Sequence, residues 1–502
     1  MTQTVQGVDP RTGSVVGSPI PLTTPDELAV ALSAAAAASE SFGTSAPPVR
    51  IAFLHALADA FDAARDELVP LAMAETGLPE ARLTGEVART SGQLRLFADV
   101  VADGGYLDVI VDPPTSSRPD LRRWREPLGP VLVYAASNFP FAFSVLGGDT
   151  ASALAAGCPV LVKAHPSHPG VSLLTARLAS PVVSSLGLPD GVFGLLFGDE
   201  IGVAALRDPR VKAAGFTGST TGGRFLFDVA TGRPDPIPFY GELGSINPSV
   251  VTPAAVSARA SSIAEGFVAS MSLGTGQFCT KPGLLFVPAG SELVELLAAA
   301  VSSMTAGPLL NARIGAQLAS GRSALEASAA VSVVGCGAAA PSDGTWAVPT
   351  LYRVTARDLV ADPALLAAEY FGPNAIVVEY SSAEELVEAL GVVEGSLTAT
   401  IHAEPSDDVA RAVFPVLRAK AGRVLHNGWP TGVAVTWAMQ HGGPWPSTTA
   451  STTTSVGATA IERWVRPVCY QDVPSFLLPD ALHDDNPWHL PRRVDGHLQL
   501  PG

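Results

Sequence analysis

In the first hundred residues, the apolar positions have the spacing of amphipathic helices. In the segment "TTPDELAVALSAAAAASESFG", Thr24 is predicted to cap a helix that begins at Pro25, with Glu27 completing a capping box. The alanines that follow have the highest helix propensity of any residue. A second helical block is predicted over residues 48–102, where four apolar residues share one face: Leu54, Leu57, Ala58 and Phe61.

From residue 131 onward, short apolar runs alternate with helix-sized segments. The runs lie at 131–136, 159–164, 192–197 and 213–218, and "IPFYGELG" is a fifth. Such alternation predicts a parallel sheet covered on both faces. After about residue 245 it resumes, with strands predicted at "LLFVPA", "NAIVVEY", "LTATIHA" and "GRVLHNG". The predicted fold class is therefore α/β, with two doubly wound parallel-sheet domains.

Two segments depart from this alternation. The stretch "VDPPTSSRPDLRRWREPLGP" is polar, basic and rich in proline, which predicts a loop or an exposed ribbon. Near the C-terminus, "TSVGATAIERWVRPVCYQDVP" is first rich in threonine and then β-prone. We expect both segments to lie outside the two sheets.

Composition narrows the class of protein. Hydrophobic residues make up 47% of the 502 residues and charged residues 16%, which favours a sizeable core over disorder. A net charge of -16 argues against a nucleic-acid or anionic-membrane surface. The sequence has no apolar run of membrane-spanning length, and its start lacks the pattern of a secretory signal. These features predict a cytoplasmic protein.

The cysteines and histidines predict no metal site. The four cysteines form no C-x-x-C motif, and the 9 histidines are scattered along the chain. Reduced thiols in a cytoplasmic protein are the simplest interpretation. The cysteines are Cys158, Cys279, Cys336 and Cys469.

Small or polar residues follow the predicted strands, where a doubly wound sheet binds its ligand. Gly218 and Ser219 begin "GSTTGG", which is either a phosphate-binding turn or an ordinary strand–helix turn. Lys163 ends an apolar strand and either contacts a ligand hydroxyl or phosphate or extends to solvent. Asn138, in "SNFPF", is either a turn residue before a proline bend or an N–H donor beside a reacting oxygen.

Two further residues suit covalent chemistry. Glu242, in "FYGELGS", lies among apolar and glycine residues, which tend to raise the pKa of a carboxylate as a general base requires. A salt-bridged glutamate at a strand end is the alternative. Cys279 lies in "GTGQFCTKPG", where glycines leave room for a substrate and supply backbone N–H donors for an oxyanion. An inert loop cysteine is the alternative.

Taken together and in this order, the motifs resemble the aldehyde dehydrogenase superfamily. The resemblance extends from about Pro19 to Pro474 and implies an enzyme that oxidises an aldehyde to a carboxylic acid through a cysteine thiohemiacetal and thioester, with NAD or NADP as cofactor. The matching stretches are "SNFPF", "VLVKAHP", "FTGSTTGG", "ELGSINP", "GQFCTKPG", "EYFGP" and "HNGWPTG".

The resemblance also implies a domain organisation. A Rossmann-like cofactor-binding domain is expected at residues 1–115 and 133–243, and a catalytic domain at 244–440. An oligomerisation arm and tail, built as a small β ribbon, are expected at 116–132 and 455–502. A homodimer or homotetramer is therefore implied.

Residue roles follow from the family pattern. Cys279 resembles the nucleophile, Glu242 the base that activates the hydrolytic water, and Asn138 the oxyanion donor. Five residues resemble cofactor contacts: Lys163 and Glu369 for ribose, Gly218 and Ser219 for pyrophosphate, and Phe371 for nicotinamide. Lys163 is counted among the catalytic residues as well.

One departure from the family pattern concerns the cofactor. Many members that prefer NAD have a glutamate three residues after the lysine, and here that position is Pro166. Without that carboxylate a 2′-phosphate is not repelled, so NADP is predicted to be used at least as well as NAD. Lys163 and, when protonated, His165 are expected to favour the phosphate.

A second departure concerns the branch of the family. "KAHPSHPG" and the segment that begins "QHGGPWPS" resemble the branch of the α-ketoglutaric semialdehyde dehydrogenases and a bacterial NADP-dependent fatty aldehyde dehydrogenase. In that branch the histidine of "HGG", here His441, is thought to assist the base. A histidine that caps a Gly-Gly turn is the alternative.

The branch implies α-ketoglutaric semialdehyde (2,5-dioxopentanoate) as substrate, and a medium- or long-chain aliphatic aldehyde is the alternative. A substrate carboxylate would require a cation near Cys279, for which Lys281 and Arg466 are candidates. Five aromatic residues are candidates for lining either substrate: Phe139, Phe141, Phe143, Phe278 and Trp429. A catalytically silent binding protein and a thioester-type esterase without redox chemistry are the competing functions.

Overall fold

The computed structural model describes residues 3–501, and its N-terminal helices form where the apolar spacing predicts them. Helix α1 (Pro25–Gly43) begins after Thr24, whose side chain accepts from the Glu27 N–H while the Glu27 carboxylate accepts from the Thr24 N–H. The predicted capping box is therefore confirmed. The block predicted over 48–102 is divided into three helices: α2 (Pro47–Ala63), α3 (Arg65–Thr76) and α4 (Glu80–Asp103).

The first sheet is parallel and has five strands in the order β7-β6-β5-β8-β9. Each strand coincides with a predicted apolar run: β5 (Val131–Tyr134), β6 (Val160–Lys163), β7 (Phe193–Leu196), β8 (Ala213–Thr217) and β9 (Phe239–Glu242). The order reverses on the two sides of β5, so the switch point at which such sheets bind ligands lies between β5 and β8.

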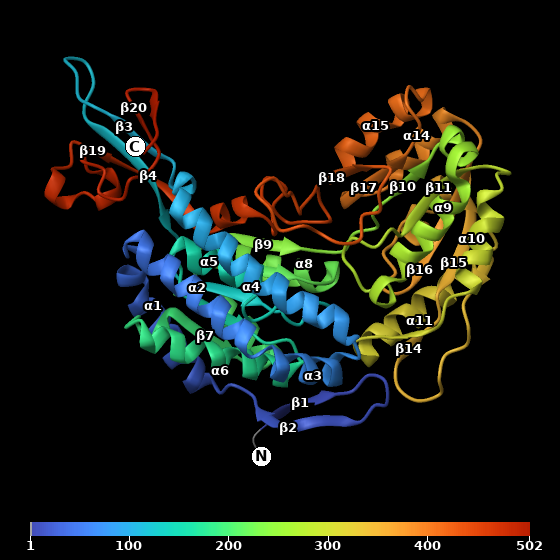
Figure 1. Cartoon of the computed structure of the whole chain (residues 1–502), viewed down its shortest axis with the longest axis horizontal. Helices are drawn as coiled ribbons and strands as arrows, with labels where there is room; N and C mark the ends of the chain where they lie inside the picture. Colours follow the sequence, from blue (N-terminus) through green and yellow to red (C-terminus); the bar gives the residue numbers. More distant parts are fainter. Residues whose placement is uncertain (1–2, 502) are drawn as a thin grey trace.

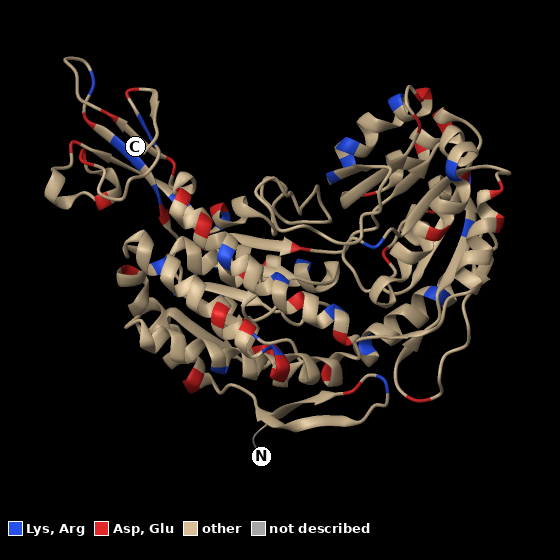
Figure 2. Ribbon diagram, in the orientation of Figure 1, with Lys and Arg blue, Asp and Glu red and all other residues tan. Residues whose placement is uncertain are grey.

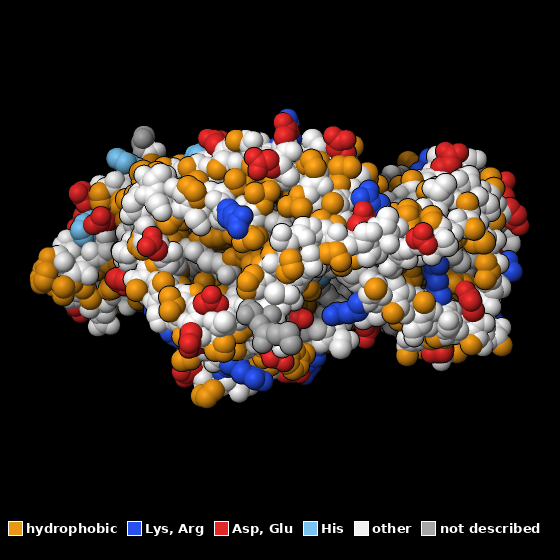
Figure 3. Space-filling model, turned by 90° about the horizontal axis from the view of Figure 1, so that it is seen from below, with side chains coloured by type: hydrophobic (Ala, Val, Ile, Leu, Met, Phe, Trp, Pro, Cys, Tyr) orange, Lys and Arg blue, Asp and Glu red, His pale blue; other side chains and the backbone are white. Residues whose placement is uncertain are grey.

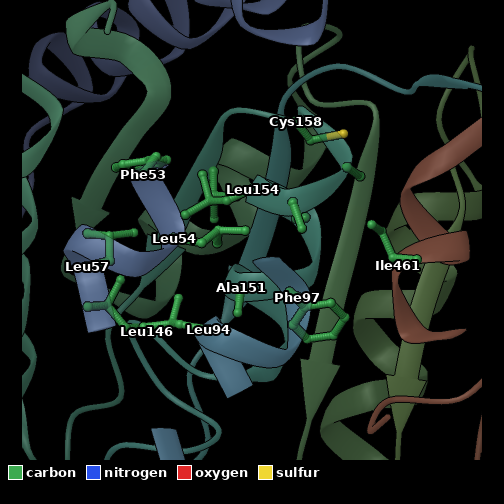
Figure 4. Packing of buried hydrophobic residues seen from close by; sticks show 14 of the residues in the cluster. Phe53, Leu54, Leu57, Leu94, Phe97, Leu146, Ala151, Leu154, Cys158 and Ile461 are labelled. Atoms are coloured by element: carbon green, nitrogen blue, oxygen red, sulfur yellow. The ribbon is translucent and has the colours of Figure 1, made fainter. Parts of the chain in front are cut away.

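Helices cover both faces of this sheet, as predicted for a doubly wound fold. They are α5 (Gly148–Ala156), α6 (Pro169–Ser185), α7 (Asp199–Arg207) and α8 (Thr220–Thr231). Figure 4 shows the core where α2, α4 and α5 meet, with Leu54, Leu94 and Leu154 packed closely and Ile461 of the C-terminal part beside them. The C-terminal segment therefore closes the core of the first domain.

The second sheet has seven strands in the order β13-β15-β16-β11-β10-β17-β18, all parallel except β13. Its predicted strands are β11 (Leu284–Pro288), β16 (Asn374–Tyr380), β17 (Ser396–His402) and β18 (Ala421–His426). Three strands were not predicted: β10 (Ser249–Val251), β13 (Ser332–Cys336) and β15 (Thr350–Thr355).

Separate apolar clusters cover the two faces of the second sheet. One cluster includes residues of α9 (Pro253–Ser272) and α10 (Leu293–Ser302), and the other includes residues of α14 (Ala383–Val392) and α15 (Asp408–Lys420). The fold is therefore α/β with two doubly wound domains, as predicted. Figure 1 shows the two domains side by side.

The polar, proline-rich segment and the C-terminal tail form a third sheet, which projects from the first domain at the left of Figure 1. Its order is β19-β4-β3-β20-β21, a mixed sheet outside both domains. The strands are β3 (Val109–Asp112), β4 (Leu121–Pro127), β19 (Val465–Gln471), β20 (Arg492–Val494) and β21 (His497–Gln499). We call this sheet the arm. It includes β3, which precedes the range expected from the sequence.

A hairpin of β1 (Thr4–Val8) and β2 (Val15–Pro21), which was not predicted, runs beneath the first domain in Figure 1.

In the part of the chain that the structure describes, the charged residues form no block of one sign along the ribbon. Figure 2 shows acidic and basic residues interspersed along it. Within residues 3–501, none of the helices has both the length and the apolar character needed to cross a membrane.

Candidate active site

A cleft of about 800 Å³ lies at the carboxyl ends of the first sheet's strands, and residues of both domains line it. The β1–β2 hairpin contributes to its rim. Every site residue predicted from the sequence lines this cleft except His441: Asn138, Lys163, His165, Pro166, Gly218, Ser219, Glu242, Cys279, Glu369 and Phe371.

The loop before Cys279 needs its glycines. Gly274, Thr275 and Gly276 have φ values of 57°, 58° and 65°, a left-handed conformation that favours glycine. A Cβ on Gly276 would lie 2.2 Å from the carbonyl oxygen of Gly372. The glycine-rich sequence therefore lets the nucleophile's loop pack against the "EYFGP" segment.

Asn247 holds the backbone on the other side of the cysteine. Its side chain is buried, and Nδ2 donates to the carbonyl oxygens of Cys279 at 2.8 Å and Lys281 at 2.9 Å. Asn247 itself has φ of 52°. Sequence reasoning did not single out this asparagine, although it lies in the "ELGSINP" motif.

Three side chains from distant segments meet at the floor of the cleft. His441 Nε2 lies 3.0 Å from Glu242 Oε1 and 3.4 Å from Cys279 Sγ. Ser455 Oγ donates to the other carboxylate oxygen, Glu242 Oε2, at 2.5 Å. The Cys279 thiol thus lies next to the Glu242 carboxylate, which can act as its base, and His441 and Ser455 orient that carboxylate. This is the arrangement that activates a nucleophile.

This geometry corrects one expectation about Glu242. Burial by itself raises the pKa of the carboxyl group, but the nearby His441 and the hydrogen bonds from His441 and Ser455 outweigh it, so the pKa lies below its usual value. Glu242 is therefore ionised at neutral pH. Burial and the Glu242 charge raise the pKa of the Cys279 thiol well above its usual value, so the thiol must lose its proton to a neighbour when it reacts.

The same three side chains are the one group within residues 3–501 whose potential metal-ligand atoms cluster, all within 4.8 Å of one another. Glu242 Oε1 and Cys279 Sγ both lie at hydrogen-bond distance from His441 Nε2, so these three side chains are explained by hydrogen bonding. We assign no metal to the site.

Asn138 lies beside the nucleophile's loop. Its Nδ2 donates to the carbonyl oxygen of Gln277 at 3.0 Å, which uses one of its two N–H bonds. The other is available to an oxygen in the cleft. The backbone carbonyl of Asn138 accepts from Arg82 Nη2 at 2.5 Å, which fixes the segment in place.

At the adenosine end of the expected cofactor site, Lys163 is paired. Its Nζ forms an ion pair with Asp199 at the start of α7; the Lys163 side chain is 9% exposed and that of Asp199 79%. Pro166 is exposed on the rim and has no side-chain acceptor. Asp199 was not predicted as a site residue, although "FGDEIG" was recognised as a strand end.

The structure also corrects the expectation for His165. Burial, with the neighbouring His168 and Lys163 adding to it, holds the pKa of His165 well below its usual value. The ring is therefore neutral at physiological pH and adds no charge that would attract a phosphate.

The turn at Gly218 and Ser219 begins α8. The Gly218 N–H donates to the carbonyl oxygen of Glu242 at 3.0 Å and is not free for a phosphate. Ser219 caps the helix, accepting from the Gly222 N–H at 3.3 Å. The N–H groups of the helix's first turn have no carbonyl partner within the helix, so this end of α8 suits an anion at the cleft.

Glu369 and Phe371 line the cleft from the second domain. Burial raises the pKa of Glu369 to about 7, against the opposing charge of Lys281. Lys281 is 2% exposed, and its Nζ donates to the carbonyl oxygens of Tyr370 at 2.8 Å and Asn374 at 2.9 Å. Lys281 therefore holds the "EYFGP" segment in place and is not free to bind a substrate.

Arg466, the other cation considered for a substrate carboxylate, lies in the arm strand β19, 3.6 Å from Glu126. Of the five aromatic candidates, three pack together beside the nucleophile: Phe139 lies 5.2 Å from Phe278 and 5.1 Å from Phe143, measured between ring centroids. Phe141 is instead buried against Phe61, and Trp429 packs on His402.

Comparison with known proteins identifies the family of the chain. The family model described as "Aldehyde dehydrogenase family" matches residues 1–466. The chain is 47% identical to "Alpha-ketoglutaric semialdehyde dehydrogenase 2" of Azospirillum brasilense, over 99% of this chain and 96% of that one. It is 41% identical to "Alpha-ketoglutaric semialdehyde dehydrogenase" of Acinetobacter baylyi, over 94% of this chain and 91% of that one.

Among solved structures, a mutant of aldehyde dehydrogenase C from Pseudomonas syringae, in complex with NAD+ and octanal, superposes with a TM-score of 0.79. It is 21% identical and covers 94% of each chain, so it shows the shared fold. The family match, the two close relatives and the meeting of a cysteine, a glutamate and an asparagine in one cleft lead to one conclusion: this chain belongs to the aldehyde dehydrogenase family.

Proposed function

We propose that this enzyme oxidises 2,5-dioxopentanoate to 2-oxoglutarate with NADP or NAD. The observation that supports the reaction is the contact of Cys279 with His441, which in turn contacts Glu242. The substrate is supported by the two relatives with 47% and 41% identity, which are named as α-ketoglutaric semialdehyde dehydrogenases.

In the first step, the Cys279 sulfur attacks the aldehyde carbon. The thiol proton passes to the ionised Glu242 carboxylate, which lies within 4.8 Å of the sulfur and accepts from His441 Nε2 at 3.0 Å. The free N–H of Asn138 and the backbone N–H of Cys279 stabilise the oxyanion of the thiohemiacetal. When bound, the nicotinamide supplies the hydride acceptor that converts the thiohemiacetal to a thioester.

In the second step, a water molecule attacks the thioester carbon and expels the Cys279 thiolate. Glu242, which has released the first proton to solvent and is ionised again, accepts a proton from this water, because the carboxylate lies next to the sulfur. Ser455 keeps the carboxylate oriented by its hydrogen bond to Oε2. The products are the carboxylic acid and the regenerated thiol.

For the cofactor, the fit rests on the cleft itself. Gly218 and Gly222 line the cleft at the start of α8, where the absence of a side chain lets a ligand come close to the protein backbone. Lys163 and the N-terminus of α8 suit the ribose and phosphates of the cofactor. Glu369 and Phe371 on the opposite wall suit the nicotinamide riboside half. We propose that NADP is used at least as well as NAD, because Pro166 supplies no carboxylate to repel a 2′-phosphate.

We also propose a cytoplasmic homo-oligomer that assembles through the arm. The cysteine chemistry needs a reduced thiol, which a reducing compartment maintains. In the arm sheet, β19 and β21 are edge strands, whose unpaired backbone groups suit pairing with a second subunit.

The test of the reaction is Cys279→Ala. Loss of covalent catalysis is expected to lower kcat by several orders of magnitude while the affinity for NADP, measured by fluorescence titration, stays within about twofold. Cys469→Ala is the matched control, because this cysteine is exposed in the arm, and it should retain wild-type turnover. Near-normal turnover by Cys279→Ala would overturn the mechanism.

A further inference from the structure

Two arginines lie against the aromatic residues next to the nucleophile, and a third donates to the same loop as one of them. Arg82 and Arg89 are seven residues apart on α4, which places them on one face of the helix, and Arg423 lies in β18. Within residues 3–501, none of the three has a carboxylate at ion-pair distance. This differs from Arg463, which is buried and forms an ion pair with Asp149 at 2.6 Å.

The hydrogen bonds of these arginines go to neutral carbonyl groups. Arg82 donates to Asn138 O, Arg89 donates to the carbonyl oxygen of Val433, and Arg423 donates to two carbonyl oxygens of the same loop, residues 430–433. The Nε of each arginine is buried without a partner, and so is Nη1 of Arg82. Buried N–H donors and positive charges are costly when no acceptor faces them.

Arg82 and Arg89 lie beside the residues that surround the nucleophile. The guanidinium carbon of Arg82 lies 4.7 Å from the ring centroid of Phe278 and 5.0 Å from that of Phe139. Phe278 directly precedes the nucleophile, and Phe139 directly follows the oxyanion donor. The guanidinium carbon of Arg89 lies 5.7 Å from the ring centroid of Phe143. The guanidinium groups of Arg82 and Arg89 therefore contact the aromatic rings that surround the nucleophile and the oxyanion donor.

The local charge balance is positive. Two acidic groups act on them: Glu86, which lies between Arg82 and Arg89 on α4, and the ionised Glu242, whose charge acts on Arg89. Glu86 Oε1 is already occupied by the N–H groups of Phe141 at 2.9 Å and Ala142 at 3.0 Å. Three cations against two carboxylates leave an excess of one positive charge in a half-buried, aromatic setting. Such a setting attracts an anion strongly, because low polarity strengthens charge interactions.

The geometry points to an anion-binding subsite formed by Arg82, Arg89 and Arg423, which receives the carboxylate of a short semialdehyde while its aldehyde carbon is held at Cys279. This inference rests on the proposed function and extends it, since it assigns the charged end of the substrate to residues that no motif identified. The neutral carbonyl contacts of the arginines fix their positions, and their unpartnered N–H groups supply the donors for the carboxylate. An uncharged aldehyde gains nothing from them.

The experiment compares 2,5-dioxopentanoate with pentanal, which has the same number of carbons and no charge. The measured quantity is the ratio of the two kcat/KM values. In the wild type this ratio should favour the charged substrate. Arg89→Met keeps much of the apolar stem and removes the charge, and we expect it to lower the ratio at least tenfold, mainly through a higher KM for the acid.

The matched control is Arg95→Met on the same helix. Arg95 forms ion pairs with Asp59 and Asp62 at the surface, so this variant should leave the ratio unchanged. Arg423→Met, on a different element, should lower the ratio in the same direction and carries the test if Arg89→Met does not fold. An equal loss for both substrates, or a ratio within threefold of wild type in both variants, would overturn the subsite.

The outcomes separate this inference from the proposed function. If the wild type favours pentanal over 2,5-dioxopentanoate, the proposed substrate is wrong and the subsite falls with it. If the wild type favours the acid while both arginine variants retain that preference, the proposed function stands and only the subsite is overturned.

Discussion

At the scale of single residues, Glu242 shows how neighbours override burial. The residue is 4% exposed, yet its carboxylate accepts from His441 and Ser455, and these contacts keep it ionised. An ionised carboxylate beside a thiol with a raised pKa is suited to receive protons at two different moments of the reaction. The two moments are separable by experiment.

The change Glu242→Gln removes the proton acceptor and keeps the side chain's shape. We expect the thioester to form and then persist, because activation of water is lost while His441, which no longer donates to a carboxylate, is free to receive the thiol proton. Rapid mixing with NADP and aldehyde should show a burst of reduced cofactor of about one equivalent per active site, followed by slow turnover. Absence of the burst would place the essential role of Glu242 before hydride transfer.

Residues at the adenosine end are expected to tune cofactor choice in opposite directions. Pro166→Glu would introduce a carboxylate that accepts from ribose hydroxyls and repels a 2′-phosphate, shifting the kcat/KM ratio toward NAD at least tenfold, about 1.4 kcal/mol. Asp199→Asn would remove the existing negative charge beside Lys163 and shift the ratio toward NADP. The measurement is kcat/KM for both cofactors with one aldehyde.

The wild-type values complete this test. If the wild type prefers NAD by a hundredfold in kcat/KM, Asp199 or another residue determines the cofactor preference, and the prediction based on Pro166 is wrong. A shift in the same direction in both variants would exclude an electrostatic cause.

At the scale of elements, α3 and α6 are joined through one buried carboxylate. Glu75, near the end of α3, accepts from the N–H groups of Gly170 and Val171 in the first turn of α6, each at 2.9 Å. Burial raises the pKa of Glu75 to about 7, even though these hydrogen bonds lower it. Between the usual pKa of 4.5 and 7, the folded protein therefore binds more protons here than the unfolded chain.

This difference predicts how stability depends on pH. The contribution of Glu75 is most favourable below about pH 4.5 and is lost as the pH rises to 7, by about 3 kcal/mol at most. Glu75→Gln resembles the protonated form and should not show this loss. Urea unfolding at pH 5 and pH 8 should thus reveal a smaller decrease in Glu75→Gln than in wild type. Glu67→Gln, exposed on the same helix, should behave as wild type, and equal pH dependence in all three would contradict this account.

Some elements could be predicted from the sequence and others could not. Strands β5 to β9 were predictable because buried parallel strands are continuous apolar runs, and the glycine-rich loop at Cys279 because its motif is distinctive. Strand β13 is an edge strand with exposed residues, and β10 has three residues, so neither has a clear apolar signature. Ser455, Asp199 and the three arginines of the anion-binding subsite belong to no motif, and only tertiary structure brings them to the site.

At the scale of the whole molecule, the arm ends in apolar side chains that face solvent. Phe476 is 83% exposed and Leu477 is 62% exposed, in a short helical turn (Ser475–Leu477) that follows β19 in the chain. Apolar side chains gather at the left end of Figure 3, the end that the arm occupies in Figure 1. Exposed apolar groups beside an edge strand are typical of a surface that a second subunit covers.

Replacing Phe476 and Leu477 together by aspartate should therefore reduce the molar mass in solution toward that of the 51.5 kDa chain, measured by light scattering after size exclusion. Two buried negative charges are incompatible with an apolar interface. The matched control is Val333→Asp, an exposed apolar residue of the second domain, which should not change the mass. An unchanged oligomer in the double variant would place the interface elsewhere.

The origin of the three contacting side chains has a consequence for how the chain acquires activity. Glu242 ends a strand of the first sheet, Cys279 belongs to the second domain, and His441 comes from the segment that follows both. No one of these units contains a working site, so a chain with one folded domain is inert even if that domain is native. Catalytic competence is therefore the last property to appear when the chain folds, and it reports the docking of the domains rather than the formation of either one.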